Sequence, residues 1–209
     1  MGNKGNLSDR TLGARIKGTP GPWDYTGEGA WQFGRKAGQQ VRAWAMATTG
    51  GYTFESPYKP RVGVEYDYAS GDSKSNDNKI QTFDPLFPTG HLYQGYQDIF
   101  YWRNGHDFKG TVSAVPATGW KVQADYHKFL LDHSFDAWYD KTGAVIARDV
   151  TGGSGRNIGD EIDLHVRTKF RDTIGLWFGY SRFLAGRFVK NTVGNMDRDW
   201  AFFQATLDF

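Results

Sequence analysis

The chain has no cysteine, almost no net charge and no long apolar run, and each absence removes a class of protein. Without cysteine it forms no disulfide framework, no thiolate metal site and no cysteine nucleophile. Its 25 basic and 23 acidic residues nearly cancel, so no bulk attraction to nucleic acid is expected. No stretch approaches the ~20 apolar residues of a transmembrane helix, which excludes a helical membrane protein.

Catalytic, cofactor and metal motifs are also missing. The five histidines never stand in a His-x-x-x-His ligand pair. The acidic segment 72–78 lacks the spacing of an EF-hand loop. The glycine-rich stretch 152–157 is neither a phosphate loop nor a nucleophile elbow. We therefore expect no metal, no cofactor and no enzyme activity, although acid pairs on one strand face would also suit a glycoside hydrolase.

What the sequence has instead is an alternation of apolar and polar residues with a period of two, which is typical of β-strands. In the clearest case, Ile162, Leu164 and Val166 alternate with charged residues. The mean hydropathy is only −0.61, which fits strands whose every second residue is polar. About nine strands are predicted, over residues 10–18, 23–34, 40–49, 60–69, 106–115, 119–128, 159–170, 173–185 and 200–209.

Half-polar strands fit either a soluble sandwich with an apolar core or a transmembrane barrel whose apolar face meets lipid. Aromatic placement favours the barrel. Trp23 and Tyr25 share a face with Trp31 and Phe33, about eight residues away, which is roughly 20 Å of height on a tilted barrel strand. Small glycines lie between the two pairs, where a soluble core would have its bulk.

The connections and the final strand favour the barrel as well. Short links alternate with long polar ones near 70–98, 132–157 and 186–198, as in an up-and-down barrel with tight periplasmic turns, and only the link near 35–39 breaks this rhythm. The last strand ends on an aromatic residue, Phe209, which resembles the assembly signal of outer-membrane barrels.

The predicted fold class is therefore all-β: an antiparallel up-and-down transmembrane β-barrel. Nine strands would leave the two chain ends on opposite sides, whereas single-chain bacterial barrels have an even number. The first residues, from Met1, also lack the apolar run of a signal peptide. We expect residues 1–209 to form a single β-barrel domain that is an N-terminally truncated portion of a larger protein.

Several stretches resemble bacterial outer-membrane proteins with an alginate export domain. The most specific is Thr82-Phe-Asp-Pro-Leu-Phe-Pro-Thr-Gly-His, and Pro60-Arg-Val-Gly-Val-Glu-Tyr-Asp-Tyr and Gly159-Asp-Glu-Ile-Asp-Leu also match. The resemblance covers nearly the whole chain but only the C-terminal half of a family member, whose barrel has about eighteen strands. It implies location in the outer membrane of a Gram-negative bacterium, contact with its lipid, and recognition of Phe209 by the barrel assembly machinery. It also implies passage of an anionic oligo- or polysaccharide, such as alginate.

A polyuronate carries one carboxylate per sugar, so a conduit needs basic groups to bind it and acids to keep that binding weak. The predicted pore-lining residues are Arg15, Glu28, Arg61, Glu65, Asp67, Asp125, Glu161, Asp163, Arg167 and Lys169. Further inward-facing candidates are Lys17, Asp24, Arg42, Lys109 and Lys121. The alternative is that these charges pair across strands and only solvate the wall.

The 82–91 segment is a candidate gate. Phe83, Asp84, Phe87 and His91 would fold over the mouth of the pore, or the segment would be an external Ω-loop packed by its own aromatic residues. The alternative function for the whole chain is a soluble β-sandwich module that binds carbohydrate through tryptophan and tyrosine.

Overall fold

The computed structural model describes residues 6–74, 76–88, 93–170 and 173–208. Within them, nine long strands follow the chain order through one antiparallel sheet. They are β1 (Leu7–Gly18), β2 (Trp23–Lys36), β3 (Gln39–Thr53), β4 (Arg61–Ala69), β6 (Gly105–Ala114), β7 (Trp120–Leu131), β10 (Asn157–Phe170), β11 (Ile174–Ala185) and β12 (Arg198–Leu207). All nine predicted strands are confirmed, most with a few more residues than predicted; the last one ends at Leu207, and Phe209 lies outside the described residues.

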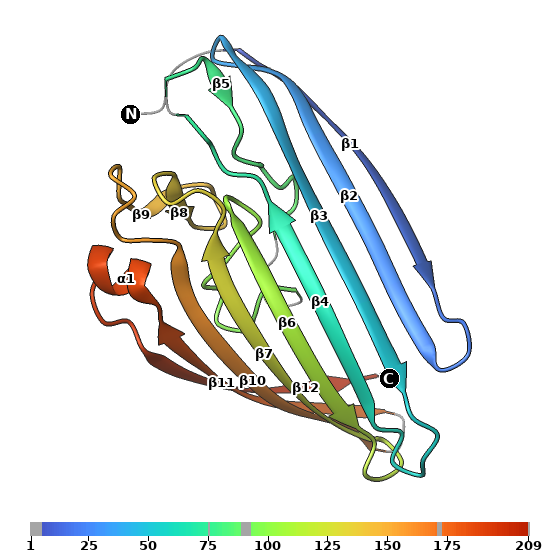
Figure 1. Cartoon of the computed structure of the whole chain (residues 1–209). Helices are drawn as coiled ribbons and strands as arrows, with labels where there is room; N and C mark the ends of the chain where they lie inside the picture. The colour runs from blue at the N-terminus through green and yellow to red at the C-terminus, as the bar shows by residue number, and fades with distance from the viewer. Residues whose placement is uncertain (1–5, 75, 89–92, 171–172, 209) are drawn as a thin grey trace.

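The sheet is an open, curved meander. Each long strand pairs with the next one along the chain, while β1 pairs only with β2 and β12 only with β11. Figure 1 shows the sheet curling until β12 passes behind β6 and β7. The all-β, antiparallel, up-and-down prediction is confirmed, and closure into a barrel stays a prediction. No helix in the described part of the chain is long and apolar enough to cross a membrane.

The two ends of the sheet differ in their connections. At one end, which we call the turn end, residues 19–22, 54–60 and 115–119 join neighbouring strands. At the other, the loop end, β4 connects to β6 through 70–104 and β7 to β10 through 132–156. The exception noted in the sequence is a two-residue hairpin, because Ala37 and Gly38 both have positive φ, as a type I′ turn requires.

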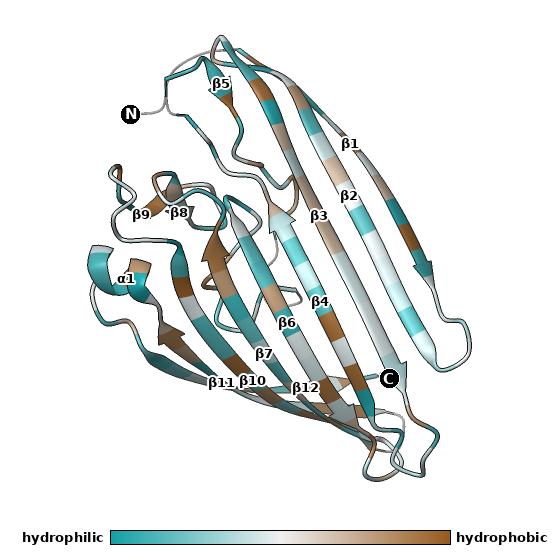
Figure 2. Ribbon diagram, in the orientation of Figure 1, coloured by the Kyte–Doolittle hydropathy of each residue, from teal (hydrophilic) through white to brown (hydrophobic). Residues whose placement is uncertain are grey.

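One face of the sheet, the outer face, is apolar and exposed. Its side chains include Trp31, Val64 and Phe203, which are 55%, 70% and 60% exposed. The inner face carries charged residues that are buried, such as Asp67 at 1% and Glu161 at 0% exposure. Figure 2 shows the resulting alternation of hydrophilic and hydrophobic positions along the strands. This distribution is the reverse of that in a soluble protein, where apolar residues are inside and unpaired charges outside.

Large aromatic side chains on the outer face gather toward the two strand ends. At the turn end, the Trp23 and Tyr52 rings lie 4.8 Å apart between centroids on β2 and β3. Toward the loop end, the ring of Trp44 on β3 lies 4.3 Å from that of Tyr68 on β4. Small residues such as Gly29 occupy the positions between, so aromatic residues near both ends of one strand face are observed as predicted, while their place at two membrane interfaces stays a prediction.

The hydrophobic core lies inside the curve of the sheet at the loop end. Phe129 of β7 and Phe183 of β11 point inward and pack with Phe100, Trp138 and Phe188 from the connecting segments. The connecting segments contain four short elements, β5 (Lys79–Ile80), β8 (Ala137–Tyr139), β9 (Val145–Arg148) and the helix α1 (Arg187–Thr192). The sequence did not predict these four elements, because pieces this short show no periodicity.

The predicted inward position of Arg42 is wrong. Register pairs Trp31 with Trp44 and Phe33 with Arg42, so the Arg42 side chain lies on the outer face. The inward residues of β3 are instead the buried Val41, Ala43 and Ala45. Polarity misleads on this strand, because a connecting segment packs against its inner face and requires small apolar residues there.

Phe188→Ala should lower the free energy of unfolding by about 3–5 kcal/mol, because it empties the space of a fully buried ring. Denaturant unfolding followed by tryptophan fluorescence would measure the change. Val193→Ala, beside the same helix but 47% exposed, is the control and should stay within about 0.5 kcal/mol of the unmodified protein. Equal effects of the two substitutions would contradict this position of the core.

Candidate functional site

The inner face divides into a basic, exposed half at the turn end and an acidic, buried half at the loop end. Four cations of the turn-end half make no ion pair with any described carboxylate, and three of them, Lys121, Arg167 and Lys169, are on β7 and β10. The fourth is Lys17 on β1. Solvent reaches all four side chains. This half of the sheet therefore presents a positive surface to the space enclosed by the curved sheet.

Two further arginines of the turn-end half are neutralised by acids. Arg61 binds Asp24 through two hydrogen bonds, Nε to Oδ2 at 2.8 Å and Nη2 to Oδ1 at 2.6 Å. The guanidinium reaches across β3 above Gly51, where a Cβ atom would lie 1.9 Å from Nη2. Arg15 lies 3.6 Å from Glu28 in an exposed pair on β1 and β2. These two pairs fit the alternative given in the sequence analysis, in which charges of the inner face neutralise each other across strands.

Arg167 and Lys121 form a like-charge pair. They are direct neighbours across β10 and β7, an arrangement that is unfavourable unless an anion or an aromatic ring compensates it. The Arg167 guanidinium lies 3.9 Å above the Trp177 ring, within cation–π range. Tyr96 from the long connection packs on the same tryptophan, with ring centroids 5.5 Å apart. A cavity of about 180 Å³ lies here, lined by both cations and by Tyr96.

The loop-end half is a buried network of acids, histidines and one lysine. His127 Nδ1 lies 2.7 Å from an oxygen of Asp107, and its Nε2 lies 3.7 Å from Asp163. His165 similarly approaches Asp125 at 3.4 Å. Next to this network, Lys109 lies 3.3 Å from Glu65, with both side chains 13% exposed. Most charges here are compensated within the wall, as the burial of ionic groups requires.

Two carboxylates in this half have no cationic partner among the described residues. Both oxygens of Asp67 are buried without a hydrogen bond. Glu161 accepts hydrogen bonds from the backbone N–H of Gln97 at 3.0 Å and from the Ser181 hydroxyl at 3.1 Å. No group of three or more acidic or histidine side chains in the described part of the chain has metal-binding geometry.

The connection between β4 and β6 folds into the hollow instead of extending outside. Its first attachment is Asp84. The Gln32 side chain donates to the Asp84 carbonyl at 2.6 Å and accepts from its N–H at 2.9 Å, as a neighbouring strand would. Arg103 pairs with the Asp84 carboxylate at 2.5 Å. Phe83 is 4% exposed and sits on Ala43 and Ala69 of the inner face.

A second attachment holds the other end of the same connection. Arg198 donates to the Gln97 side-chain oxygen at 2.8 Å and to its carbonyl at 2.6 Å. The Gln97 amide donates to the Ser181 hydroxyl at 3.1 Å. Gly95 has a φ of +83°, and a Cβ atom there would lie 2.5 Å from a Glu161 oxygen, so glycine permits the close approach.

Between the folded connection and β1–β4 lies a hollow of about 700 Å³. Phe87, Tyr93 and Trp102 line it on one side, and small residues such as Gly13 and Ala47 line it on the other. Phe87 is 92% exposed. A hollow with aromatic side chains on one side and small residues on the other, near the Arg15–Glu28 pair, can accommodate an extended polar polymer.

At the loop end, Asp132 ties the start of the folded connection to β7. It accepts hydrogen bonds from Tyr68 at 3.0 Å and from the Gly71 N–H at 2.9 Å, and it lies 3.4 Å from His106. Burial opposes its ionisation, but these contacts and nearby His133 outweigh burial and lower the pKa of Asp132. A charged Asp132 therefore stabilises this junction.

The predicted residues fall into three groups. Arg15, Glu28, Arg61, Arg167 and Lys169 lie on the inner face of the turn-end half. Glu65, Asp67, Asp125, Glu161 and Asp163 belong to the buried loop-end network. Phe83, Asp84 and Phe87 lie in the inward-folded connection, and His91 lies outside the described residues.

Sequence reasoning missed several residues of this site. Gln32, Gln97 and Arg103 hold the connection, and no local pattern marks them. Asp107 and Trp177 could have been found by extending the alternation of their strands, but β11 has apolar residues on both faces, which hid the inward direction of Trp177.

Gln32→Ala should release the Asp84 attachment. Loss of two hydrogen bonds, roughly 1–3 kcal/mol in total, should speed hydrogen exchange at the Asp84 amide by about 5- to 150-fold. Hydrogen–deuterium exchange with mass spectrometry would measure this, with Gln40→Ala on the exposed outer face as the control. Unchanged protection of residues 82–88 would contradict the attachment.

Asp132→Asn should destabilise the fold at neutral pH. A lowered pKa means that the stabilisation is present above the unfolded-state pKa of about 3.8 and is lost as the pH falls through the lower folded-state pKa. The difference between the two proteins, measured by urea unfolding, should therefore be full at pH 7 and shrink below about pH 4. A difference independent of pH would show that the charge of Asp132 is not the cause.

Comparison with known proteins agrees with the resemblance found in the sequence. A family model described as alginate export matches residues 2–202. A search of curated proteins finds no match. Because the family match covers almost the whole chain, together with the meander sheet and its charged inner face, the chain belongs to the alginate export family.

Proposed function

We propose that this chain forms part of an outer-membrane channel of a Gram-negative bacterium that passes an anionic oligo- or polysaccharide, such as alginate. The single observation that carries the proposal is the distribution of polarity between the two faces of the sheet, which is the reverse of that in a soluble protein. The outer face of the sheet exposes large apolar side chains from β1 to β12, while its inner face holds most of the charges of the strands. Lipid is the solvent that makes such an outer face favourable, and water in a lumen accounts for the inner one.

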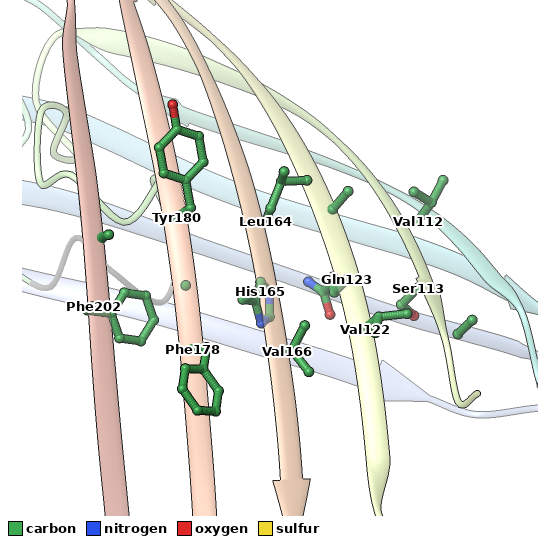
Figure 3. A pocket seen from close by; sticks show the side chains of 14 residues that line it. Val112, Ser113, Val122, Gln123, Leu164, His165, Val166, Phe178, Tyr180 and Phe202 are labelled. Atoms are coloured by element: carbon green, nitrogen blue, oxygen red, sulfur yellow. The ribbon is translucent and has the colours of Figure 1, made fainter. Parts of the chain in front are cut away.

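The outer face has the dimensions of a membrane wall. Trp23 and Trp31 are eight residues apart on β2, roughly 20 Å of height at the usual strand tilt. Between β6 and β12 the outer face has a shallow hollow of about 720 Å³, where Leu164 and Val166 lie beside Phe178 and Tyr180 (Figure 3). We assign this hollow to lipid acyl chains, because its lining is almost entirely apolar.

We propose that the sheet is part of a closed barrel, and its open edges support this. Unpaired backbone groups of β1 and β12 would be costly in hydrocarbon, so further strands are needed there. We propose that residues 1–209 form a single domain contributing its nine long strands to a barrel of about eighteen. Phe209 would serve as the signal for the barrel assembly machinery.

The charge division suggests how the polymer moves. In this orientation the turn end faces the periplasm, where the exposed Lys121, Arg167 and Lys169 would bind the carboxylates of an entering chain. Weak binding is required for passage, and the acids of the loop-end half lower the affinity further along. The inward-folded connection narrows the path and, through Phe87 and Tyr93, offers apolar surface to sugar rings.

The competing functions gain no support from the site. A carbohydrate-binding sandwich buries apolar residues between two sheets, whereas here the outer Trp31 and Val64 are exposed. Most of the inward acids are engaged with histidines, a lysine or the folded connection, which favours a charged pore wall over a hydrolase site.

Replacing Lys121 and Arg167 by glutamine should weaken anion selectivity. Loss of two solvent-exposed charges, at roughly 0.5–1 kcal/mol each, should lower the affinity for an oligouronate about five- to thirtyfold. The measurement is current block by the oligouronate, with reversal potentials in a salt gradient, for the complete protein in planar bilayers.

The control for this experiment is Lys128→Gln with Arg182→Gln, which removes two cations from the outer face. It should leave block and reversal potential unchanged. Equal block in both double variants would remove Lys121 and Arg167 from the path, and absence of any single-channel current in the unmodified protein would refute the channel itself.

A further inference from the structure

Three arginines form a cluster on the outer face at the loop end of β1–β3. Arg10 and Arg42 are the register partners of Phe33, one on each side. Arg35 lies two residues further along β2 and faces outward as Phe33 does. With ~4.8 Å between strands and ~3.3 Å per residue, the three Cα atoms lie within about 10 Å of one another. We call Arg10, Arg35 and Arg42 the arginine triad.

The triad has no anionic partner among the described residues. All three side chains are exposed, and none forms an ion pair with a described carboxylate. The outward positions of β1, β2 and β3 contain no aspartate or glutamate at all. Like charges this close are unfavourable in isolation, so an external anion would stabilise them.

Two other cations of the outer face are paired with acids. Lys128 lies 2.9 Å from Asp160, and Arg182 lies 3.0 Å from Asp199. Both pairs are near the loop end, as the triad is, but on β7–β12. Solvent exposure is therefore not the reason for unpaired cations on this face, and the arginine triad is a local exception.

An apolar platform lies beneath the triad on the side toward the turn end. Leu12, Trp31 and Trp44 are neighbours in register one step below Arg10, Phe33 and Arg42. They are 66%, 55% and 47% exposed. Three guanidinium groups above three apolar side chains match a molecule with an anionic head and acyl chains below it.

We propose that the arginine triad binds the phosphate groups of a lipid headgroup in the leaflet at the loop end of the sheet. Guanidinium groups bind phosphate through paired hydrogen bonds, and basic residues at a membrane surface attract anionic headgroups. This proposal rests on the proposed function in one respect, because it requires the outer face to lie against a bilayer. It adds a specific lipid site to that face.

The test is a binding titration of the complete protein in detergent micelles with a bis-phosphorylated glycolipid, lipid A, and with its dephosphorylated form. Trp31 and Trp44 fluorescence reports binding, because both rings lie directly below the triad. The unmodified protein should bind the phosphorylated lipid about tenfold more tightly or better. Arg10→Gln with Arg42→Gln should remove most of that preference.

Matched variants separate charge from structure. Arg10→Lys with Arg42→Lys keeps the charge and should retain a preference, while Lys128→Gln with Arg182→Gln should retain it fully. Heat-modifiable migration in detergent gels verifies that each variant is folded. Equal binding of the two lipids by the unmodified protein, or an unaltered preference in the Arg10→Gln, Arg42→Gln variant, would overturn the proposal.

Two further arms isolate the lipid site from free phosphate and from the channel. Competition by inorganic phosphate at the same concentration as lipid A would overturn the lipid assignment, and no competition is expected. Bilayer currents of the Arg10→Gln, Arg42→Gln variant should keep normal ion selectivity, because the triad lies on the opposite face from the lumen. A missing current in every protein would refute the channel alone and leave the lipid preference measurable.

Discussion

The structure depends on register. Side chains alternate between the two faces of a strand, so a slip of one residue anywhere would move a complete set of charges onto the apolar face. Across β1–β12 the pairing is continuous, and its one shift within the large sheet lies between Asn157 and Gly159 of β10. At that bulge Ile158 turns into the loop-end core and is fully buried. Gly159 permits the turn, with a φ of +156° and no room for a Cβ atom beside the Leu184 carbonyl.

Register gives the inner face its charges, and the folded connection decides which of them meet water. Residues 93–104 lie over the loop-end half, so acids that would line an open lumen are buried, and all but Asp67 are paired with histidine, lysine or backbone N–H groups. Isolated buried carboxylates would be too costly, which explains why Gln97, Ser181 and Arg198 form a network around Glu161. The turn-end half is less covered, and its four cations without a described carboxylate partner stay exposed to solvent.

The two faces thus differ in where their cations are paired with acids and where they are not. On the inner face, unpaired cations are placed where a mobile anion can reach them, and neutral pairs such as Arg61–Asp24 fill the remaining positions. On the outer face, paired charges such as Lys128–Asp160 stay at the loop-end rim, above the apolar belt. The arginine triad combines exposure, like charge and an apolar platform, the combination from which we infer a lipid site.

The strands and their faces could be predicted from the sequence, because both follow from a period-two pattern that each strand carries by itself. Thus Leu164 and His165 point oppositely whatever surrounds them, and the aromatic belts of β2 appear in its own residues. The residues whose position or role was not predicted correctly depend on partners far away in the sequence. Arg42 is outward because Phe83 needs Ala43 and Ala45 beneath it, and Gln32 and Gln97 gain their roles from residues 52 and 84 positions away. The sequence determined the wall, and the tertiary structure decided which charges the connection covers, because packing and burial join segments that no local pattern relates.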